Sequence, residues 1–232
     1  MINDIINIFN SLPSQHVIYG MLSTVLCIAG AWIYGNCSEK VRLVILQTIG
    51  YLVVFNEIVF QLYMFYYGIW SPNTSLPLEL CYISALLIPI YAKNKDNRDL
   101  KNWFFFAGFG GSLFAFINTN LSEQEHIYVS IHYFFAHGLV IFVMLSIVLD
   151  GYRPAWKDYF NTIKWTTVLV VIIIIINLLL GSNYMFTFEK PAGINFTLLM
   201  PDWPYYYLIM LFIGLSFYTI MMTVSHFLTN KS

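Results

Sequence analysis

Seven long apolar segments follow one another along this chain, and no other feature constrains its fold as strongly. The hydrocarbon core of a bilayer is about 30 Å thick, so a helix that crosses it needs about 20 apolar residues. The segments run from Val17 to Gly35, Val41 to Tyr66, Leu76 to Ala92, Trp103 to Ile117, Ile127 to Leu149, Ile163 to Gly181 and Trp203 to Leu228. The sequence therefore predicts an all-α fold, with residues 1–232 forming a single seven-transmembrane-helix bundle in a polytopic integral membrane protein.

The composition excludes the water-soluble classes of protein. Of the 232 residues, 59% are hydrophobic and 10% are charged, and the mean hydropathy is +0.68. An ordinary soluble domain is about 25% charged. So few charges cannot cover a surface that faces water, which excludes a disordered chain, a nucleic-acid-binding protein and a free cytosolic enzyme.

The fourth apolar segment is the shortest and contains three glycines. Ala107, Gly111 and Ala115 recur in it every four residues. This spacing of small residues lets transmembrane helices approach one another closely. We therefore expect a buried helix here.

The basic residues predict how the chain crosses the membrane. With seven helices, ten of the eleven Lys and Arg residues fall on one side, and Lys190 alone falls on the other. Positive charge concentrates in cytoplasmic loops, so we expect the N-terminus outside and the C-terminus in the cytoplasm. The ten residues are Lys40, Arg42, Lys93, Lys95, Arg98, Lys101, Arg153, Lys157, Lys164 and Lys231.

No motif predicts a cofactor, a structural disulfide or a removable leader. The residues before the first apolar segment lack the basic stretch of a signal peptide. Cys27, Cys37 and Cys81 are expected at unlike depths, which argues against disulfide pairing. The five histidines and three cysteines form no metal-binding spacing, so we expect no metal and no cofactor.

Cys81 and two histidines are the candidate catalytic groups. We expect Pro77 in the first turn of the third helix and Cys81 about 7 Å below its outer end, with His132 at a similar depth in the fifth helix and His137 about two turns down. A histidine near a thiol can act as its general base. His132 and His137 are about 140° apart around a helix, so we expect them to serve different sites. The alternatives are an inert buried thiol and histidines that only bond neighbouring helices.

Two acidic residues are further candidates, because an ionisable group at membrane depth marks a functional site by default. Glu57 either handles protons or donates a hydrogen bond to a neighbouring helix. Glu79 precedes Cys81 by two residues and either contacts substrate or extends to the outer interface.

Several motifs in a fixed order resemble the bacterial YwaF-like integral membrane proteins. They are Leu-Pro-Leu-Glu-Leu-Cys at 76–81, Phe-Ala-His-Gly at 135–138, the segment 177–186 containing Asn183 and Tyr184, Lys190-Pro191, and Trp-Pro-Tyr-Tyr at 203–206. The likeness spans most of the chain. Animal relatives of that family are seven-helix proteins, and one is assigned as an acyltransferase acting on ether phospholipids. The resemblance thus implies a bacterial plasma-membrane protein with a cysteine–histidine acyl-transfer site.

Carried over by motif, the implied nucleophile is Cys81 and the implied base is His137. His132 is the substitute base. The family often has histidine where this chain has Glu79. Asn183, Tyr184 and Lys190, which follow the sixth helix, are expected to bind a phosphate headgroup or the developing oxyanion; their alternative is a loop bonded to itself.

Three functions remain open from the sequence. The first is acyl transfer, or hydrolysis, on phospholipids or a lipidated protein, with Cys81 as nucleophile. The second is a lipid-binding or membrane-assembly accessory protein without catalysis. The third is a small proton-coupled carrier in which Glu57 titrates, although no inverted repeat supports it.

Overall fold

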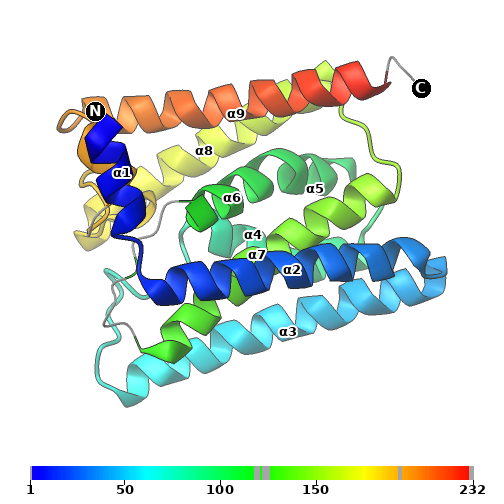
Figure 1. Ribbon diagram of the computed structural model, residues 1–232, viewed down its shortest axis with the longest axis horizontal. Coiled ribbons are helices and arrows are strands. Elements are labelled where there is room, and N and C mark those ends of the chain that lie inside the picture. Colours follow the sequence, from blue (N-terminus) through cyan, green and yellow to red (C-terminus); the bar gives the residue numbers. More distant parts are fainter. Residues whose placement is uncertain (1, 118–120, 122–125, 193–194, 230–232) are drawn as a thin grey trace.

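The computed structural model describes residues 2–117, 121, 126–192 and 195–229, and these residues form helices and loops without a strand. Within this described part of the chain, six helical stretches are long and apolar enough to cross a membrane, and Figure 1 shows how the helices are arranged. The elements are α1 (Ile2–Asn10), α2 (Ser14–Asn36), α3 (Glu39–Tyr66), α4 (Leu80–Lys93), α5 (Arg98–Trp103), the π-helix η1 (Phe104–Gly108), α6 (Phe109–Ile117), α7 (Ile127–Leu149), α8 (Trp156–Leu180), the 3-10 helices η2 (Tyr184–Phe186) and η3 (Phe196–Leu199), and α9 (Tyr205–Thr229).

The predicted all-α class is confirmed, whereas the predicted starts of the third, fourth and sixth segments were wrong. The third predicted segment becomes helical only at Leu80, and Pro77 lies in the preceding loop. Its helix α4 has 14 residues, about 21 Å, which is shorter than a bilayer core. The sixth segment begins at Trp156 rather than Ile163, because Asp158 caps the first turn of α8 by accepting a hydrogen bond from the Ala155 N–H.

The predicted fourth helix exists and contains a π-helix that the sequence did not indicate. Residues 98–117 form one helical stretch in which η1 separates α5 from α6. All five residues of η1 are buried. A Cβ at Gly111 would lie 3.4 Å from the Leu80 side chain and 3.8 Å from the Cys81 backbone nitrogen. The small residue therefore lets α6 approach the start of α4, as its spacing predicted.

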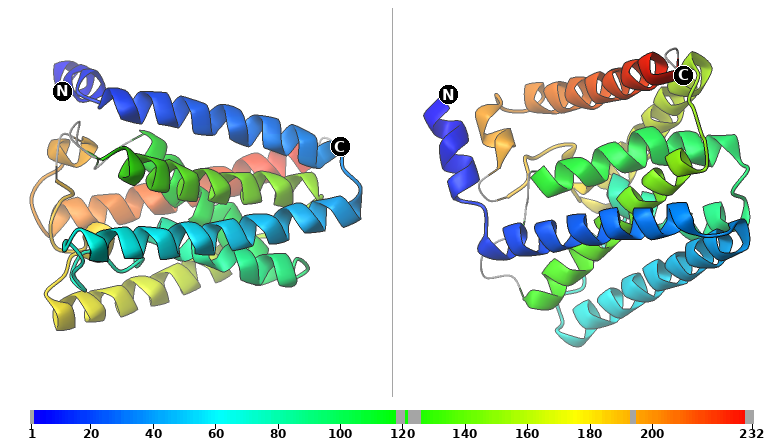
Figure 2. Two further views of the ribbon diagram at one scale, coloured as in Figure 1. Left: turned by 90° about the horizontal axis from the view of Figure 1, so that it is seen from below. Right: turned by 45° about the vertical axis from the view of Figure 1, so that its right-hand side comes forward.

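Helix α7 is the centre of the bundle. In its most apolar window 67% of the residues are buried, against 11% in α2 and in α8. It packs against α2, α3, α4 and α6, and Figures 1 and 2 show it running beside α2 with α8 and α9 further out. The outer helices present large apolar side chains such as Leu178 and Phe212, as expected of lipid-facing surfaces.

Close helix contacts hold α4 and α7 in place. A Cβ at Gly50 in α3 would lie 2.8 Å from the Pro89 Cα in α4, so these two backbones touch. On α7, a Cβ at Gly138 would lie 2.3 Å from the Ser23 Oγ of α2. Cys27 Sγ also donates to the Gly138 carbonyl at 3.1 Å. Glycine is therefore required where α4 and α7 meet their neighbours.

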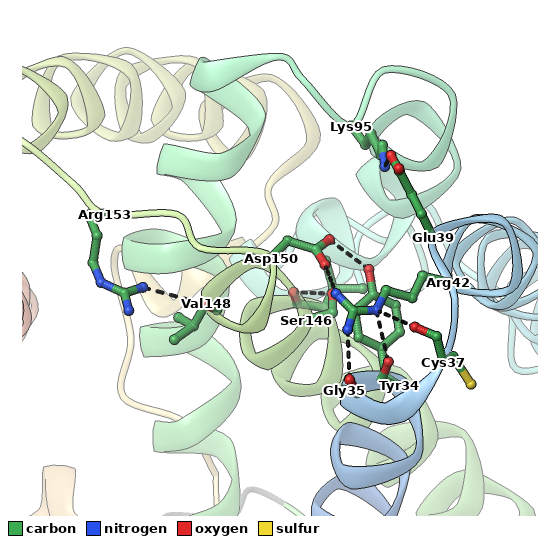
Figure 3. A network of polar contacts seen from close by, with 11 residues as sticks. Tyr34, Gly35, Cys37, Glu39, Arg42, Lys95, Ser146, Val148, Asp150 and Arg153 are labelled. Atoms are coloured by element: carbon green, nitrogen blue, oxygen red, sulfur yellow. Dashed lines mark hydrogen bonds and ion pairs between the residues drawn. The ribbon is translucent and has the colours of Figure 1, made fainter.

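The loops rich in Lys and Arg meet at one end of the bundle, which we call the basic end. Arg42 bonds Asp150 at 2.9 Å and Lys95 bonds Glu39 at 2.6 Å, as Figure 3 shows. Ion pairs thus join the beginning of α3 to the loops that precede α5 and α8. Lys231 lies outside the described residues, and the cytoplasmic placement of this end stays a prediction.

Candidate functional site

The opposite end of the bundle, which we call the site end, is closed by two loops that bind each other. The Tyr184 hydroxyl donates to the Pro72 carbonyl at 2.7 Å and accepts from the Leu76 N–H at 3.0 Å. The Glu79 carboxylate accepts from the Met185 N–H at 2.9 Å. Glu79 therefore joins the two loops, and its contact with substrate or with the outer interface stays a prediction.

A buried amide near the end of α8 organises the second loop. Asn177 donates to the Tyr184 carbonyl at 2.8 Å and to Thr187 Oγ1 at 2.7 Å. Its Oδ1 accepts from the Tyr184 N–H at 2.9 Å and from Ser182. These bonds turn the chain directly after Gly181, whose φ of 64° ends the helix. Burial in this loop raises the pKa of the Tyr184 hydroxyl above its ordinary value.

Asn183 and Lys190 use their polar groups within the loops. Asn183 donates to the Glu189 carbonyl at 2.8 Å, and its Oδ1 accepts from two backbone N–H groups. Lys190 bonds the Met200 carbonyl at 2.8 Å and Asp202 at 3.1 Å. Both arrangements match the alternative of a self-bonded loop, and a role in headgroup binding stays a prediction.

Glu57 belongs to a polar network that the sequence did not reveal. Gln61, one turn further along α3, donates to Glu57 Oε1 at 2.7 Å and to the Ser75 carbonyl at 2.7 Å. Trp70 Nε1 donates to Gln61 Oε1 at 2.8 Å. The network anchors the loop before α4 to α3. The i, i+4 spacing of Glu57 and Gln61 on one helix is the sequence feature that could have indicated their hydrogen bond.

His132 sits between α3 and α4 with both ring nitrogens facing polar groups. Its Nδ1 lies 2.9 Å from Asn56 Nδ2, and its Nε2 lies 3.7 Å from Glu57 Oε2. The ring stacks on Phe60 at 3.8 Å between centroids. These contacts fix the ring and aim Nε2 at the carboxyl group.

His137 is buried and has a defined tautomer. Its Nδ1 lies 2.6 Å from the Tyr133 carbonyl oxygen. Because a carbonyl oxygen can only accept, Nδ1 carries the proton in the neutral ring and Nε2 keeps its lone pair. This is the tautomer that a general base working through Nε2 requires.

Cys81 is the second residue of α4 and is half-buried, so it lies in the first helical turn and not a full turn below the entry. The predicted position of Cys81, about 7 Å along its helix, was wrong because α4 begins at Leu80. Tyr82, its neighbour in sequence, contacts the rings of His132 and His137, with centroid distances of 5.2 and 5.6 Å. The two histidines, which we expected to serve different sites, thus meet the same residue of α4.

A cavity of about 70 Å³ lies beneath the loops of the site end. Four of the predicted site residues line it, namely Glu57, Glu79, His132 and Tyr184. Cys81 and His137 lie outside its lining. The remaining lining residues are Phe60, Thr74, Ser75, Leu76, Pro77 and Tyr82.

The remaining cysteines and the possible metal-binding groups complete the description of the candidate residues. Cys27, Cys37 and Cys81 are free thiols. Within the described part of the chain, no three His, Cys, Asp or Glu residues group as a metal site would need.

Comparison with known proteins gives one match. No curated protein and no solved structure matches the chain. A model of the TMEM164 family matches residues 11–222, which is nearly the whole sequence and includes every candidate site residue named above. The finer likeness to the bacterial YwaF-like proteins stays a prediction. The chain is therefore a multi-pass membrane protein that belongs to the TMEM164 family.

Proposed function

We propose that this protein transfers acyl chains between membrane lipids, with Cys81 as nucleophile and His137 as general base. The observation that carries the proposal is the position of Tyr82, which is adjacent to Cys81 and packs against His137. It brings the first turn of α4 to His137, whose Nε2 lone pair is fixed by the hydrogen bond from Nδ1 to a backbone carbonyl. A thiol activated by an imidazole is a common acyl-transfer nucleophile.

The reaction follows from these two groups. His137 Nε2 takes the thiol proton as the sulfur of Cys81 attacks the ester carbonyl of a phospholipid. The tetrahedral intermediate expels the lysolipid oxygen, which receives the proton from His137, and an acyl-thioester stays on Cys81. An acceptor hydroxyl then attacks the thioester and restores the thiol. Water as acceptor gives hydrolysis instead.

The cavity provides a place for the acceptor. It lies on the side of Tyr82 that faces His132, and the carboxyl groups of Glu57 and Glu79 reach it. Tyr184 is the headgroup candidate that lines it. We assign acceptor binding to Glu57 and His132 because both line this cavity, and a phospholipid or lipidated protein at this end of the bundle is the proposed substrate.

The test uses purified protein in lipid nanodiscs that contain phospholipid with labelled acyl chains and an unlabelled lysolipid. We expect a thioester adduct by intact-protein mass spectrometry, and labelled product by lipid mass spectrometry. Cys81→Ala should abolish both, whereas Cys27→Ala, which removes a thiol buried elsewhere in the bundle, should keep both. His137→Gln should slow product formation by about 10²- to 10⁴-fold.

An unchanged lipid profile for Cys81→Ala, or the absence of any adduct on the unaltered protein, would refute the thiol mechanism. The second result, combined with lipid that copurifies in fixed ratio, would favour the accessory role. A lipidated peptide offered in place of the phospholipid tests the alternative acyl donor in the same assay.

A further inference from the structure

The basic end holds a second and larger cavity that acyl transfer does not use. Its volume is about 420 Å³, and it lies between the loop that joins α4 to α5 and the loop that joins α7 to α8. Three cationic side chains line it, those of Arg98, Lys101 and Arg153. We propose that this cavity binds the phosphate group of an anionic phospholipid.

Two carboxylates at the basic end are paired with arginines, and one of these arginines, Arg98, lines the cavity. Asp150 receives hydrogen bonds from Arg42 at 2.9 Å and from the Tyr34 hydroxyl at 2.7 Å (Figure 3). Asp158 receives both ends of the Arg98 guanidinium, at 2.8 and 2.5 Å. The positive charge of Arg42 therefore offsets the negative charge of Asp150, and Asp158 offsets the charge of Arg98.

The other two cations that line the cavity, Lys101 and Arg153, have N–H donors that are not paired with a carboxylate. Arg153 Nη1 donates to the Tyr152 carbonyl at 2.7 Å and to the Val148 carbonyl at 3.3 Å, so neutral groups hold its guanidinium against the end of α7 (Figure 3). Among the described residues, no hydrogen bond or ion pair to Lys101 Nζ is found. Asp96 is the one other carboxylate in the lining. Lys101 and Arg153 together exceed it by one positive charge, which favours an anion.

The size and shape of the cavity suit a headgroup rather than a chloride or a water. Gly151 has a φ of 84°, and a Cβ built on it would meet nothing within 4 Å, so the wall formed by this loop is open. Arginine and lysine donors spaced around an open cavity are the usual means of binding phosphate. Arg98 also lies over the Tyr152 ring at 5.7 Å, which fixes that part of the wall.

Apolar surface beside the cavity distinguishes a lipid from free phosphate. Leu149, Trp156 and Phe160 flank the lining loop in sequence, and their exposed fractions are 47%, 46% and 63%. In a membrane protein such side chains face acyl chains, and tryptophan prefers the level of the headgroups. A phospholipid can thus place its phosphate in the cavity and its chains on this surface, which free phosphate cannot do.

The test measures lipid binding and does not depend on activity. Delipidated protein is titrated with short-chain phosphatidylglycerol, with phosphatidylcholine of equal chain length, and with inorganic phosphate, while native mass spectrometry counts bound molecules. The variant is Lys101→Gln with Arg153→Gln. The matched control is Lys93→Gln with Lys157→Gln, which removes the same charge from exposed residues of the same end that do not line the cavity.

We expect the lining variant to weaken phosphatidylglycerol binding about 10-fold or more and the control to change it less than about 2-fold, since direct phosphate contacts exceed the effect of surface charge. Equal losses in both variants would overturn the proposal. So would equal affinity for the two lipids, or inorganic phosphate binding as tightly as lipid. If the double variant does not fold, Lys101→Gln alone carries the test, because the lysine forms no hydrogen bond or ion pair within the described part of the chain.

Discussion

The contact between Gly50 and Pro89 gives the sharpest test of how the fold positions α4. An alanine at position 50 would bring its Cβ to 2.8 Å from the Pro89 Cα, 3.1 Å from its Cβ and 3.2 Å from its nitrogen. Ordinary carbon contacts lie at about 3.5–4.0 Å. The atoms in the way are backbone and ring atoms that no rotamer change can move, so α3 and α4 must separate by several tenths of an ångström.

Overpacking of this kind costs about 1–3 kcal/mol. We therefore expect Gly50→Ala to lower the thermal unfolding midpoint in detergent, by about 2–4 °C for each kcal/mol in a chain of this length. The displaced α4 should also change how fast Cys81 reacts with a thiol reagent, because this cysteine lies in the first turn of the same helix.

The matched control is Gly214→Ala in α9. A Cβ there meets nothing within 4 Å, so alanine adds only its better helix propensity, worth up to about 1 kcal/mol. The variant should unfold at the same temperature as the unaltered protein or slightly higher. If Gly50→Ala were as stable as Gly214→Ala and its Cys81 reacted at an unchanged rate, the close approach of α3 and α4 would be refuted.

Three further substitutions test other contacts. Gly138→Ala should destabilise the protein by about 1–3 kcal/mol, and adding Ser23→Ala should restore most of the loss in thermal unfolding, because the clash is with that hydroxyl. Tyr184→Phe should cost about 1–3 kcal/mol and increase amide exchange in the loop before α4, whose two backbone groups lose their partner. The raised pKa of Tyr184 means that its stabilising contribution is complete below about pH 10 and falls as the pH rises through the folded-state pKa, so this variant should lose part of the alkaline destabilisation. Arg98→Lys should lower the free energy of unfolding by about 1 kcal/mol, since lysine cannot bond both oxygens of Asp158. If the unaltered protein were equally stable at low and high salt, an ionic contribution of this pair would be contradicted.

The sequence predicted the helices well because hydropathy reports directly on contact with lipid. The fourth segment is the exception, since the spacing of its small residues indicated a buried helix, and the structure has one. The start of α4 was missed for a physical reason. Leu76 and Leu78 are apolar, yet they lie in a loop that tertiary hydrogen bonds from Tyr184 hold in place. Apolar composition alone cannot distinguish such a loop from a helical turn.

The residues of the candidate site could be predicted from the sequence only in part. Glu57, His132 and Cys81 stood out because ionisable groups and thiols are rare at membrane depth. Their partners did not, because Asn56, Gln61 and Tyr82 are common residue types whose importance depends on which helix they face. The sequence also could not indicate that Glu57, Glu79, His132 and Tyr184 line one cavity, since their loops and helices meet only after folding.

The π-helix at Phe104–Gly108 affects the site because it rotates the residues of α6 about the helix axis. A π turn accommodates about one residue more than an α turn, so every residue after it is turned by about 100° relative to an uninterrupted α-helix. With this phase, Gly111 faces Leu80 and the Cys81 backbone, and Gly110 faces Phe217 of α9. An uninterrupted helix would direct a different residue at the first turn of α4. The single extra residue in η1 therefore selects which side of α6 lies against Cys81.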